Sequence, residues 1–166
     1  MDSRIAPLIT VAELNTRLFA SCCDGITDLQ SGVRLSGRTS SFLFIACHLL
    51  DARAYLVTLA GGTVDHPLLR DLRSVERVED LPVPPRLETL LSVWDTLSRE
   101  LLVSLPLMMP SGLDRDSPDR MPVSDRSVLG QLTFLFQHES YHLGQMAMVK
   151  KEITGKAMRY SAKRAM

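Results

Sequence analysis

Two histidines near the C-terminal end of the chain have a spacing that suits metal binding. His138 and His142 lie four positions apart in the segment QHESYHLGQ, residues 137–145. On an α-helix, with about 100° per residue, side chains four positions apart point only about 40° from each other and lie one turn apart. Both imidazoles can then reach one ion at about 2.1 Å. The spacing predicts that this pair binds a divalent metal ion.

A third histidine, His48, lies in the middle of the most apolar segment of the chain. A lone histidine in such a segment is more often a hydrogen-bonded core residue than a ligand. The pair changes this interpretation, because two long neighbouring helices bring mid-helix residues into one layer, and three histidines with an open position can form a reactive metal site. We therefore expect one ion, zinc or nickel, bound by His48, His138 and His142, since imidazole suits both metals. His66, before Pro67, is expected at the surface or in packing.

Three residues around the pair are candidates for catalysis. Glu139 and Tyr141 lie about 80° to either side of the histidine stripe and could serve as proton shuttle and hydrogen-bond donor. A solvated glutamate and an inter-helix tyrosine are equally good interpretations. Gln145 shares the stripe and could hold a bound water or a substrate. Asp51, three positions after His48, could orient an imidazole or form a surface ion pair with Arg53 or another arginine.

The segment from His138 to His142 also matches the HExxH pattern of zinc proteases. In those enzymes the glutamate after the first histidine is the general base, and a third ligand follows downstream. Residues 143–166 contain no histidine, and Glu152 is the sole carboxylate side chain among them. A metallopeptidase is therefore the less favoured interpretation.

Four segments with helical periodicity are expected to position these residues. They span approximately residues 3–30, 40–60, 84–105 and 124–154. Gly32 and Gly37 are expected to close the first segment, Ser40 or Ser41 to cap the second, Pro84-Pro85 to open the third, and Gly155 to end the last.

Two long loops, residues 63–83 and 107–123, separate the later helices, the first with one short helical turn around 68–72. No segment alternates apolar and polar residues as a half-buried strand does. The expected fold is an all-α four-helix bundle that forms a single domain over residues 1–166.

The composition excludes several classes of partner. Nineteen basic and nineteen acidic residues cancel, so no overall charge favours nucleic acid. The longest strongly apolar run, residues 42–50, is shorter than the about 20 residues that span a bilayer. The N-terminal residues lack the order of a secretory signal, and three cysteines without CxxC spacing indicate reduced thiols. We expect a cytoplasmic protein with neither a nucleic-acid nor a membrane partner.

The sequence resembles the DinB superfamily, the DinB/YfiT-like helical bundles. The family's HxxxH on its last helix, usually continued by Gly-Gln, matches His138 to Gln145, and its single histidine in the second helix matches His48. The connection with His66-Pro67 and the stretch 90–94 are also similar to members of this group. The resemblance covers most of the chain, although only the last-helix motif is specific.

The resemblance implies three metal-ligating histidines, an up-down-down-up bundle and often a homodimer. Some members are thiol-dependent transferases or isomerases that use bacillithiol, mycothiol or glutathione. It therefore implies a small-molecule substrate and a low-molecular-weight thiol as partners, with S-transfer to a small electrophile as the reaction. The alternative is a metal-binding bundle with a structural, sensing or stress-response role and no turnover, because a shared fold does not fix an activity.

Overall fold

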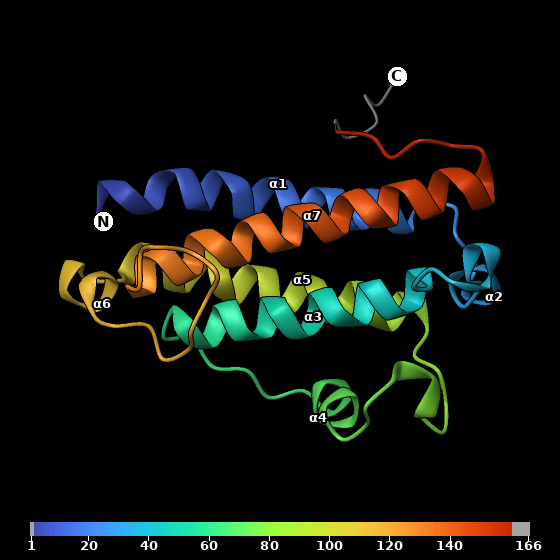
Figure 1. Cartoon of the computed structure of the whole chain (residues 1–166), viewed down its shortest axis with the longest axis horizontal. Helices are drawn as coiled ribbons and strands as arrows, with labels where there is room; N and C mark the ends of the chain where they lie inside the picture. The colour runs from blue at the N-terminus through green and yellow to red at the C-terminus, as the bar shows by residue number, and fades with distance from the viewer. Residues whose placement is uncertain (1, 161–166) are drawn as a thin grey trace.

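The computed structural model describes residues 2–160, in which helices are joined by loops (Figure 1). Its four long helices are α1 (Ala6–Cys23), α3 (Phe42–Leu59), α5 (Leu87–Ser104) and α7 (Val128–Thr154). Three short α-helices lie between them: α2 (Asp28–Ser31), α4 (Pro67–Arg73) and α6 (Pro110–Asp114). Four 3-10 turns complete the order, at Ser3–Ile5, Leu35–Gly37, Val78–Asp80 and Leu105–Leu107. Within residues 2–160 there is no strand, only an isolated bridge between Asp116 and Ser127, so the expected all-helical class is confirmed.

The four long helices pack side by side around one apolar core (Figure 1). Both α1 and α3 pack against α5 and α7. Helix α3 has buried residues of its own on nearly all of its sides, as expected for a helix in the middle of a core. By length and composition α3 could also cross a membrane, with a mean hydropathy of 1.6, but 67% of it is buried inside the protein.

The ends of α3 and α7 are set by identifiable caps. The Ser41 side chain accepts a hydrogen bond from the Phe44 N–H, so the second of the two expected serines is the N-cap of α3. Ser127 caps α7 in the same way, through the Gly130 N–H. A Cβ on Gly130 would lie 2.3 Å from the Asp125 carbonyl oxygen, so this close approach needs glycine. Gly155 ends α7 in the left-handed region, where glycine is favoured, as the sequence predicts.

Three predicted helix boundaries are wrong. The first helix ends at Cys23 rather than near residue 30, because Gly25 has a φ of 80° and Thr27 starts the separate helix α2 with its own capping box. The third helix begins at Leu87 rather than at Pro84-Pro85, with the Leu87 N–H donating to Asp28. The last begins at Val128 rather than near Ser124, because backbone hydrogen bonds to residues 115–117 hold Arg126 and Val128 beside that segment.

Candidate metal centre

Three partly buried histidines from two helices converge on one point between α3 and α7. His48 comes from α3, and His138 and His142 come from α7, which packs against it. One ring nitrogen from each lies within 4.8 Å of the other two, and Nε2 of His48 is 2.8 Å from Nε2 of His138. This cluster could hold a metal ion. The structure therefore brings together the three residues that the sequence predicts as ligands.

Aromatic packing fixes the orientation of the imidazoles. The three rings lie edge to face, with centroids 4.4 to 5.0 Å apart. Phe44 stacks almost parallel to His48, and Phe134 stacks against His138. The two phenylalanines lie one turn before the histidines that they contact, so each helix supplies both a ligand candidate and the side chain that supports it.

The surroundings favour the neutral form of two of the histidines. Burial lowers the pKa of His48, and the neighbouring imidazoles of His142 and His138 lower it further. Burial, followed by the neighbouring His142, also lowers the pKa of His138. Because a metal binds neutral imidazole, both effects reduce the competition between protons and metal.

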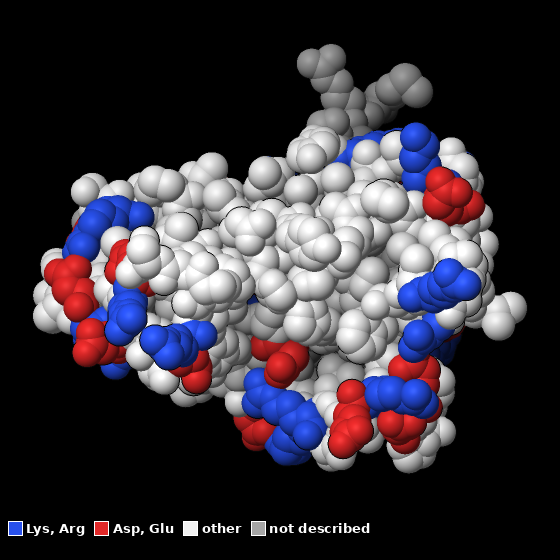
Figure 2. Space-filling model, in the orientation of Figure 1, with Lys and Arg blue, Asp and Glu red and all other residues white. Residues whose placement is uncertain are grey.

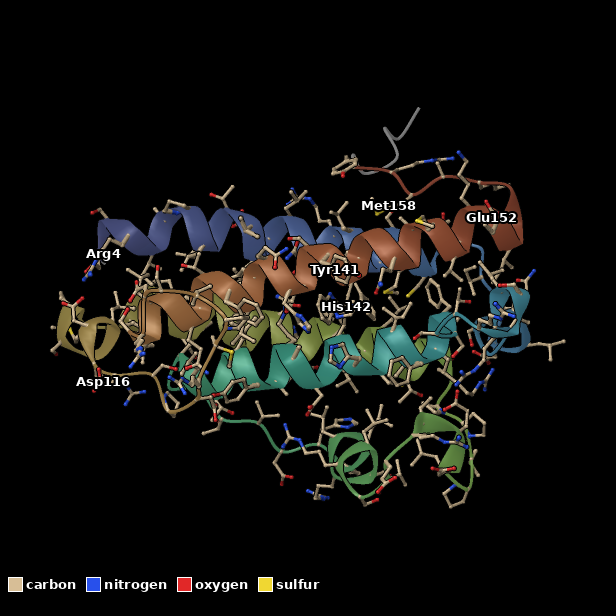
Figure 3. All side chains as sticks on the ribbon, viewed as in Figure 1. Arg4, Asp116, Tyr141, His142, Glu152 and Met158 are labelled. Atoms are coloured by element: carbon tan, nitrogen blue, oxygen red, sulfur yellow. The ribbon has the colours of Figure 1, made fainter. Side chains whose placement is uncertain are left out.

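A hydrogen-bonded chain links His142 to two of the predicted catalytic residues. Gln145 Oε1 lies 2.7 Å from His142 Nδ1, and Gln145 Nε2 donates to the Tyr141 hydroxyl at 3.0 Å. An amide oxygen only accepts, so it holds the ring proton on Nδ1 and leaves the Nε2 lone pair of His142 available to a metal. Figure 3 shows Tyr141 and His142 close together, and the Tyr141 side chain is 58% exposed.

Glu139 lies in the core rather than in solvent, so its interpretation as a solvated glutamate is wrong. The residue is 0% exposed. Its two carboxylate oxygens accept hydrogen bonds from Arg53 at 2.7 and 2.8 Å, and Asn15 donates to it at 3.2 Å. Among the described residues, no hydrogen bond joins this carboxylate to the three histidines. Sequence reasoning missed the pair, although an arginine inside the most apolar helix was a signal that it needs a buried partner.

Asp51 forms a surface ion pair with another arginine, Arg73 of α4, at 2.7 Å, as one of its two interpretations states. Both residues line a cavity of about 250 Å³ beside His48, between α3 and the segment 72–78. His66 caps α4, since its Nδ1 accepts a hydrogen bond from the Leu68 N–H. His66 is thus a partly buried helix cap, which the expectation of a surface or packing role did not specify, and it takes no part in the cluster.

The three cysteines are free and buried. Burial raises the pKa of Cys22 and of Cys47 to about 12 and that of Cys23 further. Cys47 adjoins His48 in sequence, but as a neutral thiol it is a poor nucleophile and a poor metal ligand.

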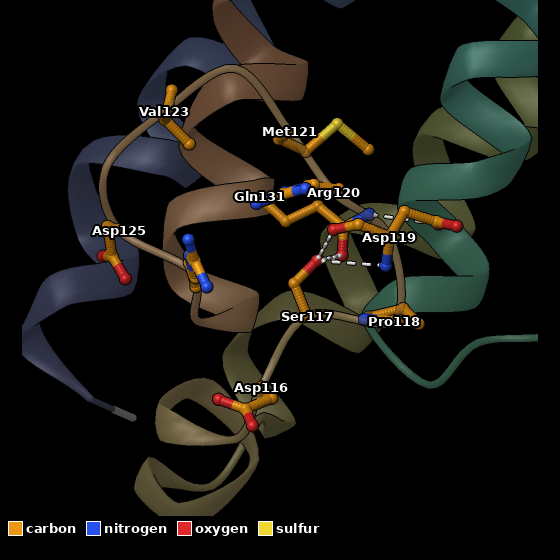
Figure 4. A pocket seen from close by; sticks show the side chains of 10 residues that line it. Asp116, Ser117, Pro118, Asp119, Arg120, Met121, Val123, Asp125 and Gln131 are labelled. Atoms are coloured by element: carbon orange, nitrogen blue, oxygen red, sulfur yellow. Dashed lines mark hydrogen bonds between the residues drawn. The ribbon is translucent and has the colours of Figure 1, made fainter.

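Gln131 lies on the same stripe of α7 as the histidines but has a different role. Its fully buried amide accepts a hydrogen bond from the Ser117 hydroxyl at 2.7 Å and donates to the Tyr55 hydroxyl at 2.7 Å. Asp119 completes this network, which lies beside a cavity of about 440 Å³ (Figure 4). The amide therefore joins both the loop 115–127, through Ser117, and α3, through Tyr55, to α7.

No known protein-family model matches this chain, and no curated protein matches it.

Proposed function

We propose that the protein binds one divalent transition-metal ion through His48, His138 and His142 and uses it to act on a small molecule. The convergence of the three ring nitrogens within 4.8 Å carries this proposal. Three neutral imidazoles leave the full positive charge on the ion, which makes it a strong Lewis acid. Zinc or nickel fits this ligand set best, because imidazole suits both.

The spacing of the nitrogens supports binding with little rearrangement. Two nitrogens that each lie about 2.1 Å from one ion can be at most about 4.2 Å apart. The histidine nitrogens already lie within 4.8 Å of one another. The contact between His48 Nε2 and His138 Nε2 requires that one of these two nitrogens carries a proton. Metal binding through both nitrogens requires instead that each ring carries its proton on Nδ1.

In this proposal, residues of the protein orient the three histidines, and a water or a small-molecule thiol serves as the nucleophile. Gln145 holds the tautomer of His142, and Phe44 and Phe134 hold the other two rings. When bound, the ion would lower the pKa of a water or thiol so that a nucleophile exists at neutral pH. Because burial raises the pKa of all three cysteines, the thiol in an S-transfer would be a small molecule. Its sulfur would bond to an electrophilic carbon as the leaving group departs with the bonding electrons.

The surface around α7 is compatible with a neutral small-molecule substrate. Figure 2 shows charged side chains mainly toward the two ends and the lower edge of this face, with few in its middle. The middle of the face overlies α7 in the same orientation. A nucleic-acid site would instead need a continuous basic patch.

The position of Glu139 argues against the metallopeptidase alternative. In an HExxH protease this glutamate acts as general base on the water bound to the metal. Here its carboxylate is bonded to Arg53 and Asn15 inside the core. We therefore expect no peptidase activity.

We further propose membership of the DinB superfamily, with an up-down-down-up bundle, a homodimer and a cytoplasmic location. The colour sequence in Figure 1 supports the topology, because α1 and α7 run from left to right and α3 and α5 from right to left. Sedimentation of the purified protein tests whether it is a homodimer in solution.

Metal content tests the main proposal. The wild-type protein and four single alanine variants of His48, His66, His138 and His142 would be loaded with zinc or nickel and dialysed against a weak chelator. Wild type and His66→Ala should retain about one ion per chain, and the other three should lose most of it. If His48→Ala retains wild-type metal while His138→Ala loses it, the inter-helix site is wrong. A metal-loaded protein without thiol transfer or hydrolysis of any small electrophile would support the non-catalytic alternative.

A further inference from the structure

A fully buried ion pair lies in the middle of the helices. Arg53 on α3 and Glu139 on α7 are both 0% exposed. Arg53 Nε donates to Glu139 Oε1 at 2.7 Å, and Arg53 Nη2 donates to Glu139 Oε2 at 2.8 Å. This two-pronged geometry is the most directional that an arginine and a carboxylate can form.

The two remaining long helices complete the surroundings of the pair. Asn15 of α1 donates to Glu139, and the Arg53 guanidinium lies 4.1 Å from the ring centre of Trp94 of α5. The hydroxyls of Thr16 and Ser98 accept weaker hydrogen bonds from Arg53. No buried side-chain nitrogen or oxygen in residues 2–160 lacks a partner, so the network is complete as built.

The ion pair and the histidine cluster connect the same two helices. Arg53 is five residues after His48 on α3, about 7.5 Å along the axis, and Glu139 directly follows His138 on α7. Any sliding or rotation of α3 against α7 would therefore change both contacts together.

The ion pair makes such a shift costly, and the hydrogen bond from Gln131 of α7 to Tyr55 of α3 adds to that cost. Apolar side chains of about the right size can maintain a core without specifying one unique arrangement, so apolar packing defines the register less sharply than a directional charge pair does. A buried charge without its partner is strongly destabilising. Moving α3 by one residue would displace Arg53 about 1.5 Å along the axis and about 100° around it, which would break both hydrogen bonds to Glu139.

We propose that Arg53 and Glu139 are positioning residues that fix the register of α3 against α7 and so hold His48 opposite His138 and His142. This inference rests on the proposed metal binding. It assigns Glu139 a role in which the carboxylate fixes the position of the helices and does not contact the metal ion or the substrate.

The double substitution Arg53→Met with Glu139→Leu tests the proposal. Replacing both partners of a buried pair with apolar residues of similar size is often neutral or stabilising, so the variant should unfold at the same or a higher urea concentration than wild type. Its affinity for zinc, measured by competition with a chromophoric chelator, should fall by about 10- to 100-fold, the range for residues that orient ligands. The visible spectrum of the cobalt-loaded variant should also differ from that of wild type, because the ligand geometry changes.

Lys150→Met is the matched control. Lys150 is likewise a buried charged residue of α7, but its ammonium donates to the Ser21 carbonyl of α1 and not to α3. Its loss should leave zinc affinity within about twofold, as expected for a site that shares no partner with the cluster. A similar loss of affinity in this control would mean that any buried charge on α7 matters, and would overturn the proposal.

A folded double variant with wild-type zinc affinity and an unchanged cobalt spectrum would also overturn it. If the double variant does not fold, Arg53→Lys replaces it, because lysine keeps the charge but cannot form the two-pronged bond. That variant should also lose zinc affinity, and wild-type affinity would count against the proposal.

Failure of the proposed function is distinguishable, because wild type and Lys150→Met would then both bind no metal. In that case the crystal structure of the metal-free double variant tests the register role of Arg53 and Glu139 without any metal. Separation of His48 Nε2 from His138 Nε2 well beyond hydrogen-bond distance supports the register role, and an unchanged contact excludes it.

Discussion

Gln145 lies one helical turn beyond His142 on α7, and its side-chain oxygen is 2.7 Å from Nδ1 of that histidine. Since this contact fixes which ring nitrogen carries the proton, Gln145 should affect metal binding without touching the metal. Gln145→Leu should lower zinc affinity by about 10- to 100-fold. Gln145→Glu, which keeps an acceptor and adds a negative charge, should bind zinc at least as tightly as wild type. Competition with a chromophoric chelator measures both.

Gln137→Leu is the control for this pair of variants, because Gln137 is an exposed amide on the same helix. It should bind zinc as wild type does. Equal zinc affinities for Gln145→Leu and Gln137→Leu would show that the hydrogen bond to His142 does not contribute to binding.

Local spacing was sufficient to predict much of this site. Four-residue spacing alone places His138 and His142 on one face of a helix. The inclusion of His48 depended on the assumption that its helix neighbours theirs, which the packing of α3 against α7 confirms. Helix periodicity likewise predicted the four long helices, because each has a continuous apolar side.

Contacts between distant parts of the chain could not be predicted in the same way. Periodicity shows that Glu139 lies off the histidine stripe, but not that this side of α7 is covered by Arg53 and Asn15. The break after Cys23, in contrast, has local signals in Gly25 and in the capping box of Thr27 and Gln30, so the prediction of a helix up to residue 30 gave too much weight to Gly32 and Gly37. The start of α7 depends on backbone hydrogen bonds to the segment 115–117, which have no local sequence signature.

Lower pH should destabilise the metal-free protein. The pKa values of His48 and His138 are lowered in the folded protein, chiefly by burial, whereas in the unfolded chain they lie near about 6.5. Below about pH 6.5 the unfolded state therefore binds more protons than the folded state, so the free energy of unfolding decreases as pH falls toward the folded pKa values. Above about pH 6.5 this contribution is fully present.

Urea unfolding in the presence of a strong chelator measures this effect. The midpoint should be lower at about pH 5.5 than at about pH 7.5, and the difference should shrink in a His48→Gln, His138→Gln double variant. Identical differences in wild type and the double variant would assign the pH dependence to other groups.

The cysteines should be unreactive in the folded protein. With the pKa of Cys47 and Cys22 raised to about 12, only about one thiol in ten thousand is ionised at about pH 8. A chromogenic disulfide reagent should therefore label the native protein slowly and all three thiols rapidly in urea. Thr39→Cys, which adds a cysteine at an exposed position, should give one fast equivalent in the native state. Rapid labelling of wild type would show that a native thiol is a candidate nucleophile.

Gln131 should stabilise the loop 115–127 without contributing to metal binding. Gln131→Leu removes the hydrogen bond with Ser117 (Figure 4) and the one to Tyr55, and should lower the free energy of unfolding by about 1–3 kcal/mol. Trypsin should then cleave the loop faster, because the loop backbone around its exposed arginines is no longer anchored to α7 through Ser117. Zinc affinity should stay within about twofold of wild type, since Gln131 lies two helical turns, about 10 Å, before His138 and the Arg53–Glu139 pair still fixes the register of α3 against α7. Gln137→Leu, the exposed amide, should change neither cleavage nor stability. If Gln131→Leu resisted trypsin as wild type does but lost zinc, the amide would act on the metal centre and not on the loop.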